Sequence, residues 1–141
     1  MPQVALTELV ANAWDAGATR VNLILPDEIG GTLTVTDNGH GMTPTQFKKR
    51  WMTLRYDRLK HQGPNVEFPA GRSARPRRAY GRNGVGRHGL LCFADVYEVQ
   101  TWRDGVLATF VVGTGSGPSP FVLHRRLWAS ATAAGRSWRC A

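Results

Sequence analysis

The sequence has few cysteines and no long apolar run, and each scarcity excludes a class of protein. Its two cysteines, Cys92 and Cys140, are too few for a disulfide framework and resemble no metal site. No apolar run approaches the roughly 20 residues of a membrane span. The first residues, MPQVALTELV, lack the basic region and cleavage site of a secretory signal. The sequence predicts a cytoplasmic protein, with no membrane partner and with Cys92 as a small buried side chain.

The composition fits one globular domain. The chain has 141 residues, of which 42% are hydrophobic and 20% are charged, and this balance excludes a disordered polymer. Its net charge is +8, and 15 of the 18 basic residues are arginine. Two interpretations stay open: a basic surface that attracts nucleic acid or another polyanion, or the arginine usage of a GC-rich genome.

Periodicity and turn residues predict six regular segments. They are a helix over 3–16, strands over 21–25 and 32–37, a basic amphipathic helix over 45–60 opening near Thr43, and strands over 96–102 and 106–112. Turn residues between each pair of strands predict antiparallel hairpins. Between the two halves, residues 61–82 form a long irregular loop with four arginines in Arg72–Arg78.

The last segment has a different composition. All ten acidic residues lie between Glu8 and Asp104. Residues 113–120, GTGSGPSP, are typical of a linker, and the remainder shows no clear period or caps. We expect a domain over 1–112 and a linker with an atypical tail over 113–141.

The first motif is ELVANAWDA over residues 8–16. On a helix, Glu8, Asn12 and Asp15 project near one face because they are four and three residues apart. A glutamate can act as a general base, and an asparagine oxygen suits Mg²⁺. A solvated helix face would explain the same residues.

The second motif is VTDNGHGM over residues 35–42, where a strand ends in Asp37. A buried carboxylate there could accept a hydrogen bond from an exocyclic amine such as that of adenine. Gly39 and Gly41 would allow close approach of the backbone to a ligand. A plain turn at the end of a strand is the alternative, because Asp-Asn-Gly is a common turn sequence.

The third motif begins with GRNGVGRHG and extends over residues 81–93. It contains GxGxxG, but a long basic loop precedes it and a hairpin follows, so the sequence does not predict a dinucleotide-binding βαβ unit. Glycines that open a helix still expose backbone N–H groups to an anion. Arg82, Arg87 and His88 could supplement this site or face solvent.

Together and in this order, ELVANAWDA, DNGHGM and GRNGVGRHGLLCF resemble the N-box and two glycine boxes of the GHKL ATPase superfamily. This superfamily includes gyrase B subunits, ninety-kilodalton heat-shock chaperones, histidine kinases and MutL proteins. The resemblance covers residues 5 to about 112 and implies an α+β, two-layer sandwich of the Bergerat type. Such a fold has a mixed, mostly antiparallel sheet with helices on one face. The position of Glu8 four residues before Asn12 resembles the hydrolysing branch.

The resemblance also implies site residues. Glu8 would activate the attacking water, Asn12 would bind Mg²⁺, and Asp37 would bind the adenine amino group. The implied nucleotide-binding set is Asn12, Asp15, Asp37, Gly39, Gly41, Met42, Gly81, Arg82, Asn83, Gly84, Val85 and Gly86. Residues of about 47–80 would contain a lid that closes over ATP.

The resemblance therefore implies Mg-dependent ATP binding with slow hydrolysis, and a homodimer that forms on ATP binding. Two alternatives stay open. One is a basic nucleic-acid-binding or interaction module. The other is a truncated, non-catalytic ATP-binding fragment, because residues 113–141 depart from the family pattern and no transducer domain follows.

Overall fold

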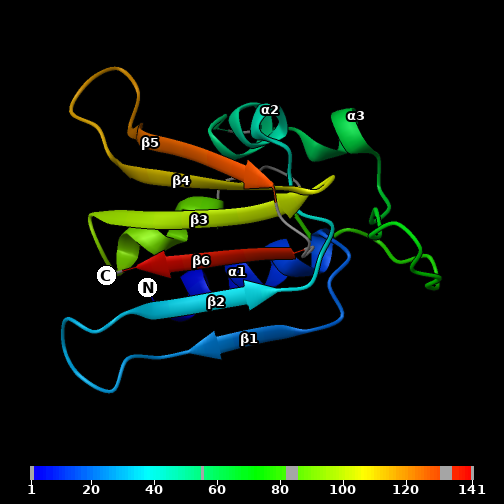
Figure 1. Cartoon of the computed structure of the whole chain (residues 1–141), viewed down its shortest axis with the longest axis horizontal. Helices are drawn as coiled ribbons and strands as arrows, with labels where there is room; N and C mark the ends of the chain where they lie inside the picture. The colour runs from blue at the N-terminus through cyan, green and yellow to red at the C-terminus, as the bar shows by residue number, and fades with distance from the viewer. Residues whose placement is uncertain (1, 55, 82–85, 131–134, 141) are drawn as a thin grey trace.

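The computed structural model of the chain describes residues 2–54, 56–81, 86–130 and 135–140. An antiparallel sheet of six strands carries short helical segments, which gives an α+β architecture (Figure 1). The strands are β1 (Val21–Ile24), β2 (Leu33–Asp37), β3 (Val96–Arg103), β4 (Val106–Thr114), β5 (Phe121–Ser130) and β6 (Gly135–Cys140). The helical segments are α1 (Pro2–Asp15), α2 (Pro44–Gln46), the π-helix η1 (Phe47–Trp51), α3 (Arg58–Gln62) and the 3₁₀-helix η2 (Gly86–Cys92). In the described ranges, no helix could cross a membrane.

The strand order is β1-β2-β6-β3-β4-β5, and each pair of neighbouring strands is antiparallel. Both predicted hairpins are confirmed, because β1 pairs with β2 and β3 pairs with β4. Asp104 and Gly105 turn the second hairpin with φ angles of 53° and 74°. Two consecutive positive φ values match the right-handed twist of the flanking strands.

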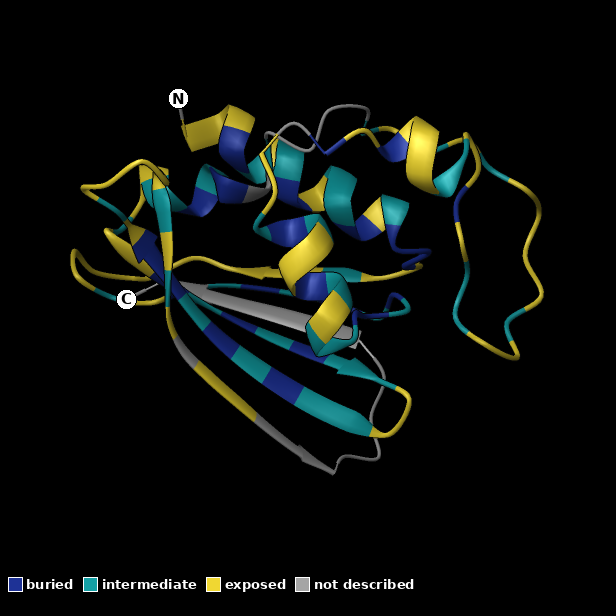
Figure 2. Cartoon of the chain, turned by 90° about the horizontal axis from the view of Figure 1, so that it is seen from above, coloured by how far each residue is buried: buried dark blue, intermediate teal, exposed yellow. Residues whose placement is uncertain are grey.

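The core lies between the sheet and the helices, which Figure 2 shows gathered on one face. Alternation in β2 turns Leu33 and Val35 toward this layer. Leu9 of α1 and Leu90 of η2 belong to the same buried cluster, and both are fully buried. The predicted pattern of buried and half-buried residues in 32–37 is therefore confirmed.

The predicted helix over 45–60 is wrong in its length. It begins as expected, since the Thr43 side chain accepts from the Gln46 backbone in a capping box. It ends at Trp51, and a second short helix starts after Asp57. Asp57 accepts from the Lys60 N–H at 3.0 Å, so a competing N-cap begins a new helix within the predicted span.

The structure also differs from the linker and tail expected over 113–141. Gly113 and Thr114 end β4, and two further strands follow in the same sheet. One of them, β6, lies between β2 and β3 and pairs with both. The sequence of β6 shows no clear period. Its two neighbouring strands come from distant parts of the chain.

Cys92 is exposed, so its predicted burial is wrong. Cys92 is the last residue of the 3₁₀-helix η2. Leu90 takes the buried position instead and has no exposed surface.

Candidate functional site

Helix α1 lies against the third motif through two glycines. Gly86 is so close to the Glu8 carboxylate that an added Cβ would overlap it. One turn away, a Cβ at Gly89 would lie 3.0 Å from the Ala5 Cβ. A side chain at Gly86 would require the Glu8 side chain to move, and one at Gly89 would press on the backbone of α1 at Ala5. Glu8 therefore lies beside the start of η2.

Asp15 holds the residues at the start of the third motif by hydrogen bonds. Its carboxylate accepts hydrogen bonds from the Tyr80 N–H at 2.7 Å and the Gly81 N–H at 2.8 Å. The Arg58 guanidinium lies 3.9 Å from the same carboxylate, and both side chains are largely buried. Asp15 thus fastens the glycine-rich segment to the end of α1, a role that the spacing of the first motif does not reveal.

The second motif meets the end of α1 through Gly39. A Cβ at Gly39 would lie 2.6 Å from the Ala16 carbonyl oxygen, so only glycine fits there. Asp37 is 5% exposed, and its Oδ1 accepts from the Gly39 N–H at 2.7 Å. Asn38 accepts from the Thr19 N–H at 2.9 Å and holds the loop between α1 and β1.

Gly41 and Met42 complete this turn. Gly41 has a φ of 65°, in the left-handed region that favours glycine. The Met42 N–H donates to the Thr101 hydroxyl at 2.7 Å, which ties the turn to β3. The His40 ring nitrogen Nδ1 lies 2.6 Å from the Gly41 carbonyl oxygen. The same nitrogen lies 3.2 Å from the Arg103 guanidinium of β3.

A cavity of about 60 Å³ lies between these motifs and the segment predicted as a lid. Asn12, Asp15 and Met42 line one side, and Arg50 and Arg58 line the other. A cavity of this size is far below the roughly 300 Å³ at which drug-sized ligands are held. Asn12, Asp15 and Met42 therefore face a small space beside the segment predicted as a lid, whereas Glu8 and Asp37 are not among its lining residues.

The arginine-rich loop packs against the end of α1, which the sequence did not predict. Arg77 donates to the carbonyl oxygens of Trp14 at 2.7 Å and Ala18 at 2.9 Å, and its guanidinium stacks 3.9 Å from the Trp14 ring. Arg72 donates to the Gly17 carbonyl at 3.0 Å. Cations at the C-terminal end of a helix also complement its dipole. We call residues 66–81 the strap, and its signal in the sequence was the arginine cluster beside a tryptophan.

Two charged groups near the site have shifted pKa values. Burial lowers the pKa of Arg77, the charge of Arg72 adds to this, and Asp15 opposes it. Burial raises the pKa of Glu67, but the hydrogen bond from Arg103 and neighbouring positive charges outweigh burial, so the pKa of Glu67 is lowered. The Arg103 Nη2 atom lies 3.0 Å from the Glu67 carboxylate.

His88 faces the core and not a ligand. Its Nε2 lies 3.0 Å from the Trp51 carbonyl oxygen, and its Nδ1 lies 2.9 Å from the Tyr97 hydroxyl. The Trp51 indole N–H donates to the same hydroxyl at 2.9 Å. Phe121 of β5 stacks on the His88 ring at 3.7 Å. The suggestion that His88 supplements an anion site is therefore wrong, and His88 joins η1, η2 and β3 instead.

Four predicted site residues lie outside the described ranges. They are Arg82, Asn83, Gly84 and Val85, at the centre of the third motif. The described ranges contain no cluster of three or more His, Cys, Asp or Glu that could hold a metal ion.

The chain matches a known protein family over most of its length. Residues 1–114 match the family described as histidine kinase-, DNA gyrase B-, and HSP90-like ATPase, which is most of the chain. The chain belongs to this GHKL ATPase family. The match ends with β4, so β5 and β6 of this GHKL domain lie beyond the matched residues.

Individual relatives agree with the family. Over 109 residues the GHKL domain is 30% identical to a protein of Herpetosiphon aurantiacus described as "Putative type II restriction enzyme HgiDII". That match covers 77% of this chain and 16% of the relative. A segment of 47 residues is 45% identical to the DNA mismatch repair protein MutL of Agrobacterium fabrum, and one of 46 residues is 51% identical to MutL of Xylella fastidiosa. These segments cover 33% of this chain and 8% and 7% of the relatives, so the chain spans a small part of their length.

Proposed function

We propose that this GHKL domain binds ATP with Mg²⁺ and hydrolyses it slowly, with Glu8 as the general base. The observation that carries the proposal is that the second and third motifs both lie against the helix of the first motif. Gly86 lies against Glu8, Gly81 lies against Asp15, and Gly39 lies against Ala16. Segments that are far apart in the sequence thus lie against one helix, which a chance set of turns does not explain.

The residues present fit a nucleotide. Asn12 lines the cavity, and its amide oxygen is a hard ligand of the kind that Mg²⁺ takes. When bound, Mg²⁺ would neutralise charge on the phosphates. Asp37 would accept from the adenine amine, beside Gly39, Gly41 and Met42. The glycine-rich segment over 81–86 would donate backbone N–H groups to the phosphates.

Hydrolysis needs a proton acceptor beside the phosphates. Glu8 lies against Gly86, at the opening of η2, and it is half-buried. A carboxylate held there can accept a proton from a water molecule, while neighbouring groups orient that water. This arrangement supports the Glu-containing, hydrolysing branch and a sandwich of the Bergerat type.

The lid hypothesis is part of the proposal. Arg50 and Arg58 come from the segment opposite Asn12, and the cavity between them is too small for a nucleotide. We therefore expect this segment to move outward when ATP enters, and Asp15 to act as a positioning residue for the strap. Dimerisation on ATP binding stays a prediction, which sedimentation with and without ATP would test.

Nucleic-acid binding is not favoured by the arginine cluster. Arg72 and Arg77 donate to backbone carbonyls of the domain itself, so two of the four arginines in the cluster already make hydrogen bonds within the domain. The names of the relatives concern DNA repair and restriction, but their matched segments cover small parts of those proteins.

The experiment that tests hydrolysis compares Glu8→Gln with the wild type. We expect ATP turnover to fall by about 10²- to 10⁴-fold, because the amide cannot accept the proton, while ATP binding persists. Glu28→Gln is the control, since Glu28 is exposed in the loop between β1 and β2 and should leave turnover unchanged. Equal turnover in the wild type and Glu8→Gln would refute this role of Glu8.

A further inference from the structure

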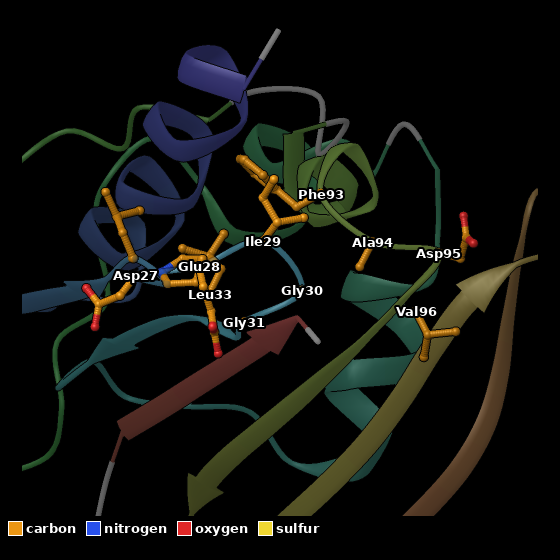
Figure 3. A pocket seen from close by; sticks show the side chains of 12 residues that line it. Asp27, Glu28, Ile29, Gly30, Gly31, Leu33, Phe93, Ala94, Asp95 and Val96 are labelled. Atoms are coloured by element: carbon orange, nitrogen blue, oxygen red, sulfur yellow. The ribbon is translucent and has the colours of Figure 1, made fainter.

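One hollow in the described part of the chain is lined by none of Glu8, Asn12 and Asp37, and it reaches the third motif only at its last residue, Phe93. Its volume is about 830 Å³, and it lies between the loop that joins β1 to β2 and the segment that enters β3 (Figure 3). Leu33 and Asp37 are the first and last residues of β2. Leu33 lines this groove, whereas Asp37 belongs to the nucleotide site, so the two sites lie at opposite ends of the strand.

The groove has an apolar surface that remains in contact with solvent. Ile29 is fully exposed at the tip of the loop, and Leu25 is 59% exposed beside it. Phe93 and Val96 form the facing side and are also exposed. Large apolar side chains gathered around a hollow are typical of an interaction site, whereas isolated exposed ones are not.

The charge of the groove is opposite to that of the molecule. Asp27, Glu28 and Asp95 are among its lining residues, and the described residues that line it include no lysine, arginine or histidine. The whole chain has a net charge of +8 and only ten acidic residues. Nearly a third of its carboxylates therefore line one groove, where they repel phosphates and attract cations.

Its dimensions indicate the kind of occupant. A hollow of 830 Å³ has room for a few side chains, and its carboxylates exclude nucleotide and nucleic acid. A protein segment with apolar side chains next to lysine or arginine can contact the apolar surface and pair with the carboxylates. Lysine and arginine stems can also cover apolar surface while their charged ends reach the rim.

We propose that this groove binds a protein segment in which apolar side chains alternate with lysine or arginine. Ile29, Leu25 and Phe93 contact the apolar side chains, and Glu28 and Asp95 pair with the basic ones. The proposal stands apart from ATP binding, because none of these residues belongs to the nucleotide site.

The test uses two fluorescent synthetic peptides in an anisotropy titration of the full chain. One alternates leucine with lysine, and its partner has glutamate in place of each lysine. We expect the lysine peptide to bind at least about tenfold more tightly, with or without Mg-ATP, and less tightly as salt rises. Ile29→Ser should weaken binding by about tenfold, because one large apolar contact is lost. Glu28→Lys combined with Asp95→Lys should weaken it at least as much.

The control is Val10→Ser, which removes another exposed apolar side chain, from α1. It should leave peptide affinity unchanged, and melting curves should show all variants folded. Equal affinity for both peptides, or affinity that Ile29→Ser leaves intact, would overturn the proposal. Self-association that Ile29→Ser abolishes would also overturn it, by identifying a second copy of this chain as the occupant.

Discussion

At the scale of single residues, Asp15 and Asp37 each hold a glycine-rich turn through a backbone N–H. Asp15 accepts from Gly81 at 2.8 Å, and Asp37 accepts from Gly39 at 2.7 Å. An ionised acceptor makes a stronger hydrogen bond than a neutral one. Both oxygens of Asp15 are engaged by backbone groups, since Tyr80 donates to the second. This favours a positioning role for Asp15 over direct contact with a nucleotide.

Glu67 provides a prediction about pH. Its pKa is lowered from an ordinary value of 4.5, so its pairing with Arg103 stabilises the fold above about pH 4.5. This contribution should disappear as the pH falls through the lowered pKa. Glu67→Gln should reduce the free energy of unfolding at pH 7 by less than about 1 kcal/mol, because half of the Glu67 side chain is exposed. At the lowest pH the variant and wild type should be equally stable.

Denaturant unfolding at several pH values measures this difference. The matched control is Glu28→Gln, in the exposed loop between β1 and β2. A difference that grows toward acid would contradict the assigned direction of the shift.

At the scale of elements, the strap and α1 depend on one another. Arg77 and Arg72 bind the carbonyl oxygens at the end of the helix, and the Trp14 indole N–H donates back to the Arg78 carbonyl at 3.0 Å. The strap thereby supplies hydrogen bonds to carbonyls that a helix leaves without partners at its C-terminal end.

Replacing Arg77 with alanine should lower the free energy of unfolding by about 1–2 kcal/mol, because two hydrogen bonds and a ring contact are lost. Hydrogen exchange should accelerate in the strap before it does so in the sheet. Arg75→Ala is the matched control, since Arg75 is exposed in the same loop. If both variants are equally stable and equally protected, the strap does not depend on Arg77.

The helix, the hairpins and the order of the motifs were predictable because local patterns determine them. The alternation in β2 and the turn at Asp104 and Gly105 lie within a few residues of what they control. The break at Asp57 was less predictable, since two N-caps compete in one amphipathic segment. Of the candidate site, Glu8, Asn12 and Asp37 could be proposed from the resemblance of the motifs to the GHKL family. The partners of Asp15 could not, because Tyr80 and Gly81 lie 65 and 66 residues away.

At the scale of the whole molecule, β6 joins two halves of the sheet. It pairs with β2 on one side and with β3 on the other. In the strand order that the structure describes, β1 and β2 have no other connection to β3, β4 and β5 within the sheet. The segment beyond the family match therefore completes the sheet, which composition alone could not predict.

A chain that ends at Thr114 should fail to fold cooperatively. The loss of β5 and β6 would expose the edges of β2, β3 and β4 and uncover apolar surface beneath the helices. Circular dichroism should show a cooperative thermal transition for the full chain and none for the shortened one. Leu127→Ser, an exposed position in β5, should melt like the full chain. An unchanged transition in the shortened chain would mean that residues 1–114 fold alone.

Nucleotide binding by Asp37→Asn is the most direct test of the central claim. The amide can still accept from the Gly39 N–H, but it lacks the charge that strengthens a bond from the adenine amine. Calorimetric titration should show Mg-ATP binding to the wild type and an affinity about 10- to 100-fold lower for Asp37→Asn. Asp27→Asn, in an exposed loop at the other end of the sheet, should bind like the wild type. Wild-type protein that fails to bind millimolar ATP, or affinity unaffected by Asp37→Asn, would contradict the account.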